Sequence, residues 1–286
     1  MFEPVAAAGH RISVATYNIH RCIGRGRGPD LGRTLDVIED LDADIIALQE
    51  VETPAAPSAA AIVLLRRLAD LGYEPVLGPT MRGHRHSYGN VLLSRLPVRR
   101  RRRIDQSQPR REPPGLIDVR LELRPAQQRG GRGAMLPMLE RLMTRPAGAG
   151  QARSREEARP LTGLGRAGHL RCLATHLGLR AGERREQIAA IAERLDLAGR
   201  EAAVRMDWTG AAAGRLPLVL LGDFNEWRPG GRRLRPINAR LEAAPALGTW
   251  PARRPLLALD RIWYRGGLRL TDLEVIRTPL ARAASD

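Results

Sequence analysis

The sequence predicts an α/β fold in which two β-sheets stack face to face and helices cover their outer sides. With 286 residues and a hydrophobic fraction of 43%, the chain is long enough to bury one large core. Short apolar segments outnumber amphipathic helical ones, and some of them are continuous apolar runs, which is typical of strands buried on both faces. The patterning by itself also allows a single doubly wound sheet.

The first part of the chain is predicted to run strand, helix, strand. Residues 11–19 carry the β-branched pattern of a buried strand, and residues 24–28 are glycine-rich and predict a loop. Asp30 is suited to cap a helix whose apolar residues share one face, and the run ADIIALQEV after it predicts a buried strand. Beyond these, a helix is predicted at 58–71 and strands near Tyr73, at 90–94 and at 115–123.

The second part contains one segment without a clear pattern. Residues 124–168 are rich in Gly, Arg, Gln, Ala and Pro and have little apolar periodicity, so we predict a long, mostly disordered insertion, with a lid as the alternative. Strands are predicted at 169–177, 217–225 and 256–266, and a helix at 183–197. With no internal repeat, residues 1–286 are expected to form a single domain.

Composition limits the class of protein less than the net charge of +16 suggests. A basic surface attracts phosphate backbones, but every basic residue is arginine and Ala, Gly and Pro are abundant, which is typical of biased coding DNA. Two cysteines cannot form a disulfide framework. The sequence has neither a signal peptide pattern nor an apolar run of about 20 residues, so we expect a cytoplasmic monomer without a membrane span.

Polar side chains follow several of the apolar segments, where a sheet ends and ligands commonly bind. They are Asn18, Glu50, His176, Asp223, Asn225 and Asp260. Any one of them alone is more often a turn former or a structural histidine. Together they supply carboxylate oxygens for a hard divalent cation, a base for water and neutral donors for phosphate oxygens. The set therefore indicates hydrolysis of a phosphodiester.

Six motifs in order resemble those of the endonuclease/exonuclease/phosphatase family. They are TYNIH at 16–20, LQEV at 48–51, YGNVLLSRLPV at 88–98, THL at 175–177, GDFN at 222–225 and LDRIW at 259–263. The resemblance covers most of the chain and implies a four-layer sandwich of two mixed sheets flanked by helices. It also implies divalent-metal-dependent hydrolysis of a phosphodiester substrate, with nucleic acid among the candidate substrates.

The resemblance implies a role for each matching residue. Glu50 would hold Mg²⁺ or Mn²⁺, with Asn18 and Asp286 assigned to the same metal site. Asp223 would orient or deprotonate the attacking water, and Asn225 and His176 would hold phosphate oxygens or the leaving group. Asp260 would orient a partner histidine. Contacts to substrate phosphate are assigned to Arg21, Tyr88 and Asn90.

The chain departs from the family pattern at its end, where the family closes with Ser-Asp-His and a further apolar strand. Here Ser285 and Asp286 are the last residues, so the histidine and that strand are expected to be missing and activity to be impaired. Truncation is favoured over divergence because the six polar residues remain. The alternatives are a phosphomonoesterase or lipid-headgroup phosphodiesterase of the same family, and a catalytically dead phosphate or nucleic-acid binding protein.

Two further features are assigned structural roles. The arginine run 99–103 follows a predicted strand and is expected to be a solvated edge rather than a clamp for a polyanion. Trp227 and Trp263 have the chemistry to stack on a base, but core packing beside their strands is the favoured interpretation.

Overall fold

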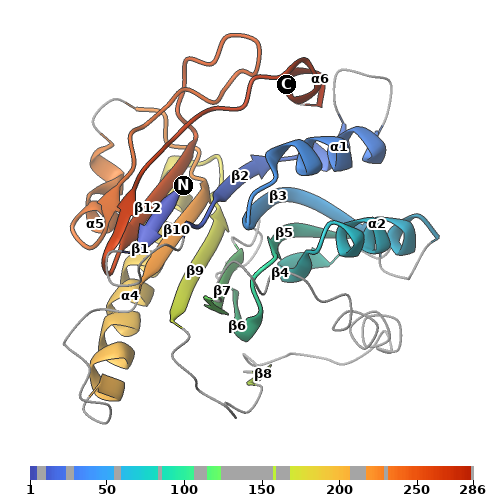
Figure 1. Ribbon diagram of the computed structural model, residues 1–286. Helices are drawn as coiled ribbons and strands as arrows, with labels where there is room; N and C mark the ends of the chain where they lie inside the picture. The colour runs from blue at the N-terminus through green and yellow to red at the C-terminus, as the bar shows by residue number, and fades with distance from the viewer. Residues whose placement is uncertain are drawn as a thin grey trace.

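The structure is a computed structural model of the whole chain. It describes residues 1–4, 11–23, 29–54, 59–82, 86–105, 115–123, 157–158, 168–206, 217–228 and 231–284. Within these residues the chain forms two large mixed sheets with helices on their outer sides (Figure 1), as the sequence predicts. None of the described helices combines the length and the apolar character needed to cross a bilayer.

The smaller of the two large sheets has four strands in the order β2-β3-β5-β4. Their bounds are β2 Val14–Asn18, β3 Ile45–Pro54, β4 Glu74–Arg82 and β5 His86–Ser94. Strands β2 and β3 are parallel, whereas β5 is antiparallel to both β3 and β4. The sheet therefore contains the two strands that the sequence predicts on either side of the first helix, with β2 at its edge.

The larger sheet has seven strands in the order β11-β12-β10-β9-β7-β6-β8. Their bounds are β6 Val98–Asp105, β7 Gly115–Glu122, β8 Glu157–Ala158, β9 His169–His176, β10 Leu218–Asp223, β11 Glu242–Ala243 and β12 Asp260–Arg265. Only β9 and β10 are parallel neighbours, so both end at the same rim. A separate ribbon pairs β1 Phe2–Pro4 with β13 Leu268–Leu270.

Helices complete the layers. They are α1 Leu31–Leu41, α2 Ala59–Asp70, α4 Ala181–Met206, α5 Arg235–Asn238 and α6 Pro279–Ala284, with 3-10 turns η1 His20–Cys22 and η3 Arg232–Leu234. Helix α1 begins as predicted, because the Asp30 carboxylate accepts a hydrogen bond of 2.9 Å from the Arg33 backbone N–H. Its apolar face and that of α2 pack on the four-stranded sheet.

Three apolar clusters separate the four layers. One lies between the sheets and joins Ile45 and Leu92 to Val119 and Val219. A second packs α4 and α5 on the outer face of the seven-stranded sheet, and the third packs α1 and α2 on the four-stranded sheet. This is the sandwich that the family resemblance implies, and it excludes the single doubly wound sheet.

Some predicted boundaries are wrong. The arginine run 99–103 does not follow a strand but forms the middle of β6, where it pairs with β7. The run LLAL before Asp260 is irregular, and the strand begins at Asp260 itself. Helix α4 is longer than the predicted 183–197. The predicted insertion at 124–168 lies outside the described residues except for β8 and Gly168.

Candidate active site

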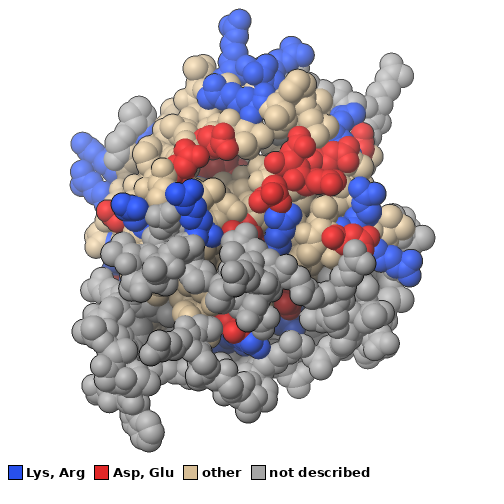
Figure 2. Space-filling view, viewed as in Figure 1, with Lys and Arg blue, Asp and Glu red and all other residues tan. Residues whose placement is uncertain are grey.

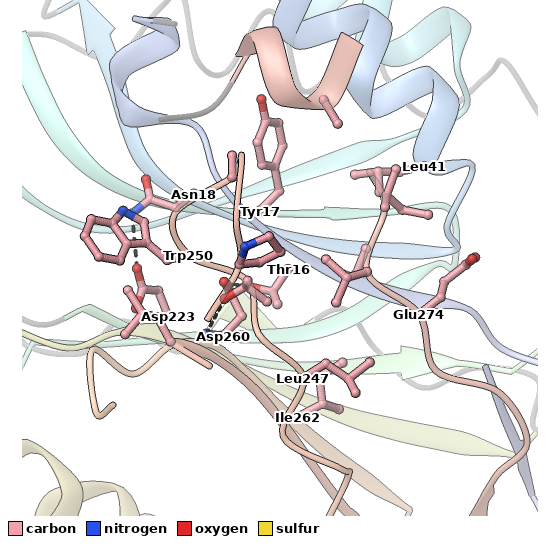
Figure 3. A pocket seen from close by; sticks show the side chains of 18 of the residues that line it. Thr16, Tyr17, Asn18, Leu41, Asp223, Leu247, Trp250, Asp260, Ile262 and Glu274 are labelled. Carbon is pink, nitrogen blue, oxygen red and sulfur yellow. Dashed lines mark hydrogen bonds between the residues drawn. The ribbon is translucent and has the colours of Figure 1, made fainter. Parts of the chain in front are cut away.

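The six polar residues singled out from the sequence line one cavity of about 920 Å³ at a common rim of the two sheets. Strands β9 and β10 are parallel and end side by side, so His176 and Asp223 are register partners. Asn18 ends β2 of the other sheet, and Glu50 lies in β3 beside it. Figure 3 shows Asn18 and Asp223 pointing toward one another across the space between the sheets.

The centre of this rim is an amide held between two carboxylates. The Nδ2 atom of Asn18 donates to Glu50 Oε1 at 3.0 Å and to Asp223 Oδ2 at 3.2 Å. Its Oδ1 atom accepts from the His20 backbone N–H at 3.1 Å, which fixes the orientation of the amide. The His20 ring also approaches Glu50, with Nδ1 3.7 Å from Oε2. The two sheets therefore contribute one carboxylate each to the same amide.

Glu50 reaches the rim because its strand is irregular at that point. The pairing of β3 with β5 shifts register between Leu48 and Val51, as in a β-bulge, and Glu50 has a φ of +58°. A bulge re-aims side chains, and a left-handed non-glycine residue is strained unless its surroundings hold it. The strain here coincides with the carboxylate that the sequence assigns to metal binding.

The segment after β10 brings Asn225 onto His176. The backbone N–H of Asn225 donates to Asp223 Oδ1 at 2.9 Å, and Asn225 has a φ of +49° in this tight turn. Its side-chain Nδ2 then lies 3.2 Å from His176 Nε2 and donates to the Leu177 carbonyl at 2.8 Å. His176 Nε2 is also 3.8 Å from Asp223 Oδ2. Base, amide and imidazole thus form one connected group.

Gly222 makes the close approach of β9 and β10 possible just before Asp223. Its φ is +147°, and an added Cβ would lie 1.9 Å from the Thr175 carbonyl oxygen. No side chain fits at that distance, so the glycine is required by backbone contact. The neighbouring residue, Asp223, is consequently placed by main-chain packing rather than by its own contacts alone.

Asp260 lies at the same rim for a reason that the sequence did not reveal. Strand β12 runs antiparallel to β10, so its first residue, not the residue after its end, stands opposite Asp223. Asp260 Oδ1 accepts from Thr16 Oγ1 at 3.3 Å, and the Asp260 N–H donates to Thr249 Oγ1 at 3.3 Å. These threonines, and not a histidine, are its hydrogen-bond partners in the described part of the chain.

The environment of Asp260 favours the protonated carboxyl group. The side chain is only partly exposed and faces the cavity rather than open solvent, so withdrawal from bulk water raises its pKa to about 7, with the nearby Asp223 carboxylate adding to the rise. The hydrogen bonds from Thr16 and Thr249 oppose this effect without cancelling it. The Asp260 carboxyl group therefore keeps its proton to a higher pH than an ordinary aspartate does.

Buried ion pairs of Glu226 connect helix α4 to the two segments that follow β9 and β10. Glu226, which is 1% exposed, accepts from Arg233 at 3.0 Å and lies 3.5 Å from the Arg184 Nε atom. Arg184 in turn donates to the carbonyl oxygens of Gly178 and Leu179, directly after His176. Helix α4 therefore holds the segment after β9 and the segment after β10 in one arrangement.

Of four other residues assigned from the sequence, two do not line the cavity and two lie outside what the structure describes. Arg21 is exposed in η1, and the buried Asn90 amide donates to the Gly115 carbonyl at 3.1 Å, so neither lines the cavity. Tyr88 belongs to β5, but its side chain is outside the described part. Asp286 also lies outside the described residues.

Sequence reasoning missed several residues of the cavity. His20 belongs to the TYNIH motif, so its position was a usable signal. Thr249 and Trp250 come from a loop without periodicity, and Arg184 looks like any surface arginine of an amphipathic helix. Only the folded chain shows that these side chains share one wall.

The cavity holds more carboxylates than guanidinium groups although the chain as a whole is strongly basic. The carboxylates that line it are Asp42, Glu50, Asp223, Asp260, Asp272 and Glu274, and the arginines are Arg184, Arg277 and Arg282. On the face shown in Figure 2, acidic side chains gather in the upper half of the molecule, where Figure 1 places α1. Repulsion from these carboxylates opposes the entry of an anionic phosphate unless nearby positive charge offsets it.

The donor set at the centre fits a small divalent cation of the magnesium type. Such a cation prefers one or two carboxylates and completes its shell with water and phosphate oxygens, so it needs no closed protein cage. Glu50 supplies a carboxylate in the bulge, and Asn18 and Asp223 lie beside it. In the described part of the chain, no three His, Cys, Asp or Glu side chains gather into a complete metal cage.

The protein has two stacked mixed sheets, and carboxylates and an imidazole line their common rim. This combination is that of an α/β sandwich with a polar site at the rim of its sheets. The family model described as Endonuclease/Exonuclease/phosphatase family matches residues 15–286, so the chain belongs to that family. Family membership supports phosphoester hydrolysis as the class of reaction.

Similar proteins match most of this chain at low identity. Uncharacterized protein YbhP of Escherichia coli K12 is 26% identical over 273 residues, covering 88% of this chain and 84% of its own length. An endonuclease/exonuclease/phosphatase structure from Beutenbergia cavernae has a TM-score of 0.56 at 18% identity, covering 89% of this chain, which spans 64% of that protein. The human Nocturnin catalytic domain with bound sulfate has a TM-score of 0.51 at 17% identity, covering 100% and 93%.

Proposed function

We propose that this protein hydrolyses phosphodiesters with the help of Mg²⁺ or Mn²⁺. The observation that carries the proposal is the Asn18 amide held between Glu50 and Asp223, one from each sheet, at a rim that also presents His176 and Asn225. Family membership supports the reaction class, and the excess of carboxylates in the cavity supports the need for a cation.

Glu50 would hold the cation through its carboxylate. Asn18 would contribute through its amide oxygen Oδ1, which in this structure accepts from the His20 backbone N–H. When bound, the cation supplies Lewis-acid stabilisation of charge on the phosphoryl oxygens. The side chains of the protein itself would activate the water and bind the phosphate. Asp223 has one oxygen engaged by the Asn225 N–H and the other directed at Asn18 and His176, so it is restrained enough to accept a proton from an attacking water.

Asn225 and His176 act as donors to the phosphate. Their nitrogen atoms lie 3.2 Å apart and contact each other. With the tautomer of His176 that carries its proton on Nε2, both nitrogens are donors, and both would turn to a phosphate oxygen placed beside them. The Asn225 amide is oriented by the Leu177 carbonyl, which limits its freedom before substrate arrives. Preorganised donors of this kind stabilise the charge that develops as water adds to phosphorus.

A panel of substrates tests the proposal. Protein stripped of metal with EDTA is assayed with bis(p-nitrophenyl) phosphate, p-nitrophenyl phosphate and sphingomyelin, before and after addition of Mn²⁺ or Mg²⁺. We expect bis(p-nitrophenyl) phosphate to be hydrolysed only after metal is added, and faster than the monoester p-nitrophenyl phosphate. Hydrolysis confined to the monoester would move the assignment to a phosphomonoesterase, and no hydrolysis with any metal would contradict the proposal.

A further inference from the structure

Two exposed tryptophans line the cavity that contains the proposed phosphoester site. Trp227 is 52% exposed and Trp250 is 42% exposed, yet both belong to the cavity wall. A single exposed apolar side chain needs no explanation, but large aromatic surfaces on one functional cavity mark a binding surface. Figure 3 draws the Trp250 indole in the same cavity wall as Asn18 and Asp223.

Trp250 is held in place by an ordered hairpin. Its backbone exchanges hydrogen bonds with Leu257, at 3.0 Å and 2.9 Å, and its carbonyl also accepts from the Leu256 N–H at 2.9 Å. The preceding residue, Thr249, accepts from the Asp260 N–H. The backbone of Trp250 is therefore fixed relative to Asp260, which limits the conformational entropy lost when a ligand stacks on the indole.

Trp227 is fixed in a similar way from the other loop. It directly follows Glu226, whose carboxylate is buried in the ion pairs with Arg184 and Arg233. Its indole nevertheless stays exposed, with the Arg228 guanidinium 6.0 Å from the ring centroid. Trp263 behaves differently, because it is 2% exposed, packs on Phe224 and donates to Asn238. Core packing, expected for both tryptophans, is thus correct for Trp263 and wrong for Trp227.

We propose that Trp227 and Trp250 bind the substituent that stays on the phosphate after the leaving group departs, and that this substituent is a planar aromatic group such as the base-bearing part of a nucleotide. This inference rests on the proposed function, which places the phosphate at Asn18, Asp223 and Asn225. Indole faces favour planar π-systems, and stacking is tolerant of the identity of the ring. The two residues set which substituent is preferred, and the polar rim acts on the phosphate.

Esters with the same leaving group separate binding of the substituent from the reaction itself. Phenyl, methyl and octyl p-nitrophenyl phosphates are assayed with Mn²⁺ for wild type, Trp250→Leu, Trp250→Phe and Trp227→Leu. Leu256→Ser is the matched control, because Leu256 lies on the same hairpin, is 80% exposed and does not line the cavity.

We expect each Trp→Leu change to lower kcat/KM for the phenyl ester about tenfold, to leave the methyl ester within about twofold, and Trp250→Phe to keep most activity. Equal losses on the phenyl and methyl esters, or the same loss in Leu256→Ser, would overturn the inference. Equal losses on the phenyl and octyl esters would overturn the aromatic preference in favour of an aliphatic one.

A binding measurement keeps this inference distinct from the proposed reaction. If wild type hydrolyses no ester, the proposed function fails, and the tryptophans are then tested by titrating thymidine 5′-monophosphate while following indole fluorescence. Quenching that needs at least fivefold more ligand in Trp250→Leu supports the binding surface. No quenching in wild type, or equal midpoints for wild type and variant, overturns it.

Discussion

Asp223 and Asp260 stand directly opposite each other in the antiparallel pair of β10 and β12. Neighbouring carboxyl groups at such a site cannot both ionise freely, and the structure meets this conflict by surrounding them unequally. Asp223 is linked to Asn18, Asn225 and His176, whereas Asp260 has two threonine partners and a pKa raised to about 7. Asp260 is therefore the carboxyl group of this pair that is largely neutral below pH 7.

This asymmetry predicts a pH-dependent effect of Asp260→Asn. A carboxyl group with a pKa raised in the folded state binds a proton more tightly there, so its presence costs stability as the pH rises from about 4 to about 7. Asparagine removes that cost. In EDTA, we expect the variant to match wild type near pH 4 and to be more stable by about 1 kcal/mol or more at pH 8, measured by urea unfolding.

An exposed carboxylate on α1 provides the control for this effect. Asp36→Asn should show no such change of relative stability with pH. A stability difference between Asp260→Asn and wild type that stays constant from pH 4 to pH 8 would contradict the account of the pair.

Metal binding is predicted to depend on the carboxylate in the β3 bulge. Glu50→Gln keeps the shape of the side chain and its contact with Asn18 but removes the charge that a hard cation requires. We expect Mn²⁺ affinity, measured by titration calorimetry, to fall at least tenfold. Glu52→Gln, an exposed change two residues along the same strand that does not line the cavity, should bind Mn²⁺ like wild type. Equal affinities in all three proteins would exclude Glu50 as a ligand.

Removing the negative charge of the buried Glu226 is predicted to lower the stability of the protein strongly. Glu226→Gln leaves the guanidinium groups of Arg184 and Arg233 without the charge that compensates them, at a position that is 1% exposed. Breaking a buried pair in this way costs about 3 kcal/mol or more. Urea unfolding measures it, and the exposed Glu242→Gln is the control. A decrease in the free energy of unfolding below about 0.5 kcal/mol would show that these ion pairs do not stabilise the rim.

Gly222 is predicted to tolerate no side chain. An alanine Cβ would meet the Thr175 carbonyl oxygen and force β9 and β10 apart just before Asp223. We expect Gly222→Ala to cost about 4 kcal/mol or more or to prevent folding. Gly199 in α4 has open space around its Cβ position, so Gly199→Ala should stabilise the protein by about 0.5–1 kcal/mol. Thermal unfolding of the two variants compares them directly, and a stable Gly222→Ala protein would show that the strands can separate at little cost.

The sequence predicted the layers of the fold because apolar runs such as 45–48 and 218–221 can only be buried strands. It also predicted the rim residues at strand ends, since Asn18, His176 and Asp223 end strands that meet there. It placed Asp260 at the correct rim but at the wrong end of its strand, because the direction of β12 depends on its long-range pairing with β10 rather than on local pattern.

The sequence pattern does not predict which loop and helix residues line the cavity. Trp250 comes from an irregular loop, and its exposure depends on hydrogen bonds to Leu257 that no periodicity encodes. Arg184 has the same helical environment in sequence as its exposed neighbour Arg185, and only the fold buries one of them against Glu226. Side chains on loops and single helical positions are placed by tertiary contacts.

The most direct test of the central claim compares wild type with Asp223→Asn in the hydrolysis of bis(p-nitrophenyl) phosphate with saturating Mn²⁺. Asparagine can keep the hydrogen bond with the Asn225 N–H but cannot accept the proton of the attacking water. The account predicts that both proteins unfold at similar urea concentrations and that kcat falls by about 10²–10⁴ in the variant. A kcat equal to that of wild type, in a variant shown to be folded, would contradict the claim that this rim performs metal-dependent phosphodiester hydrolysis.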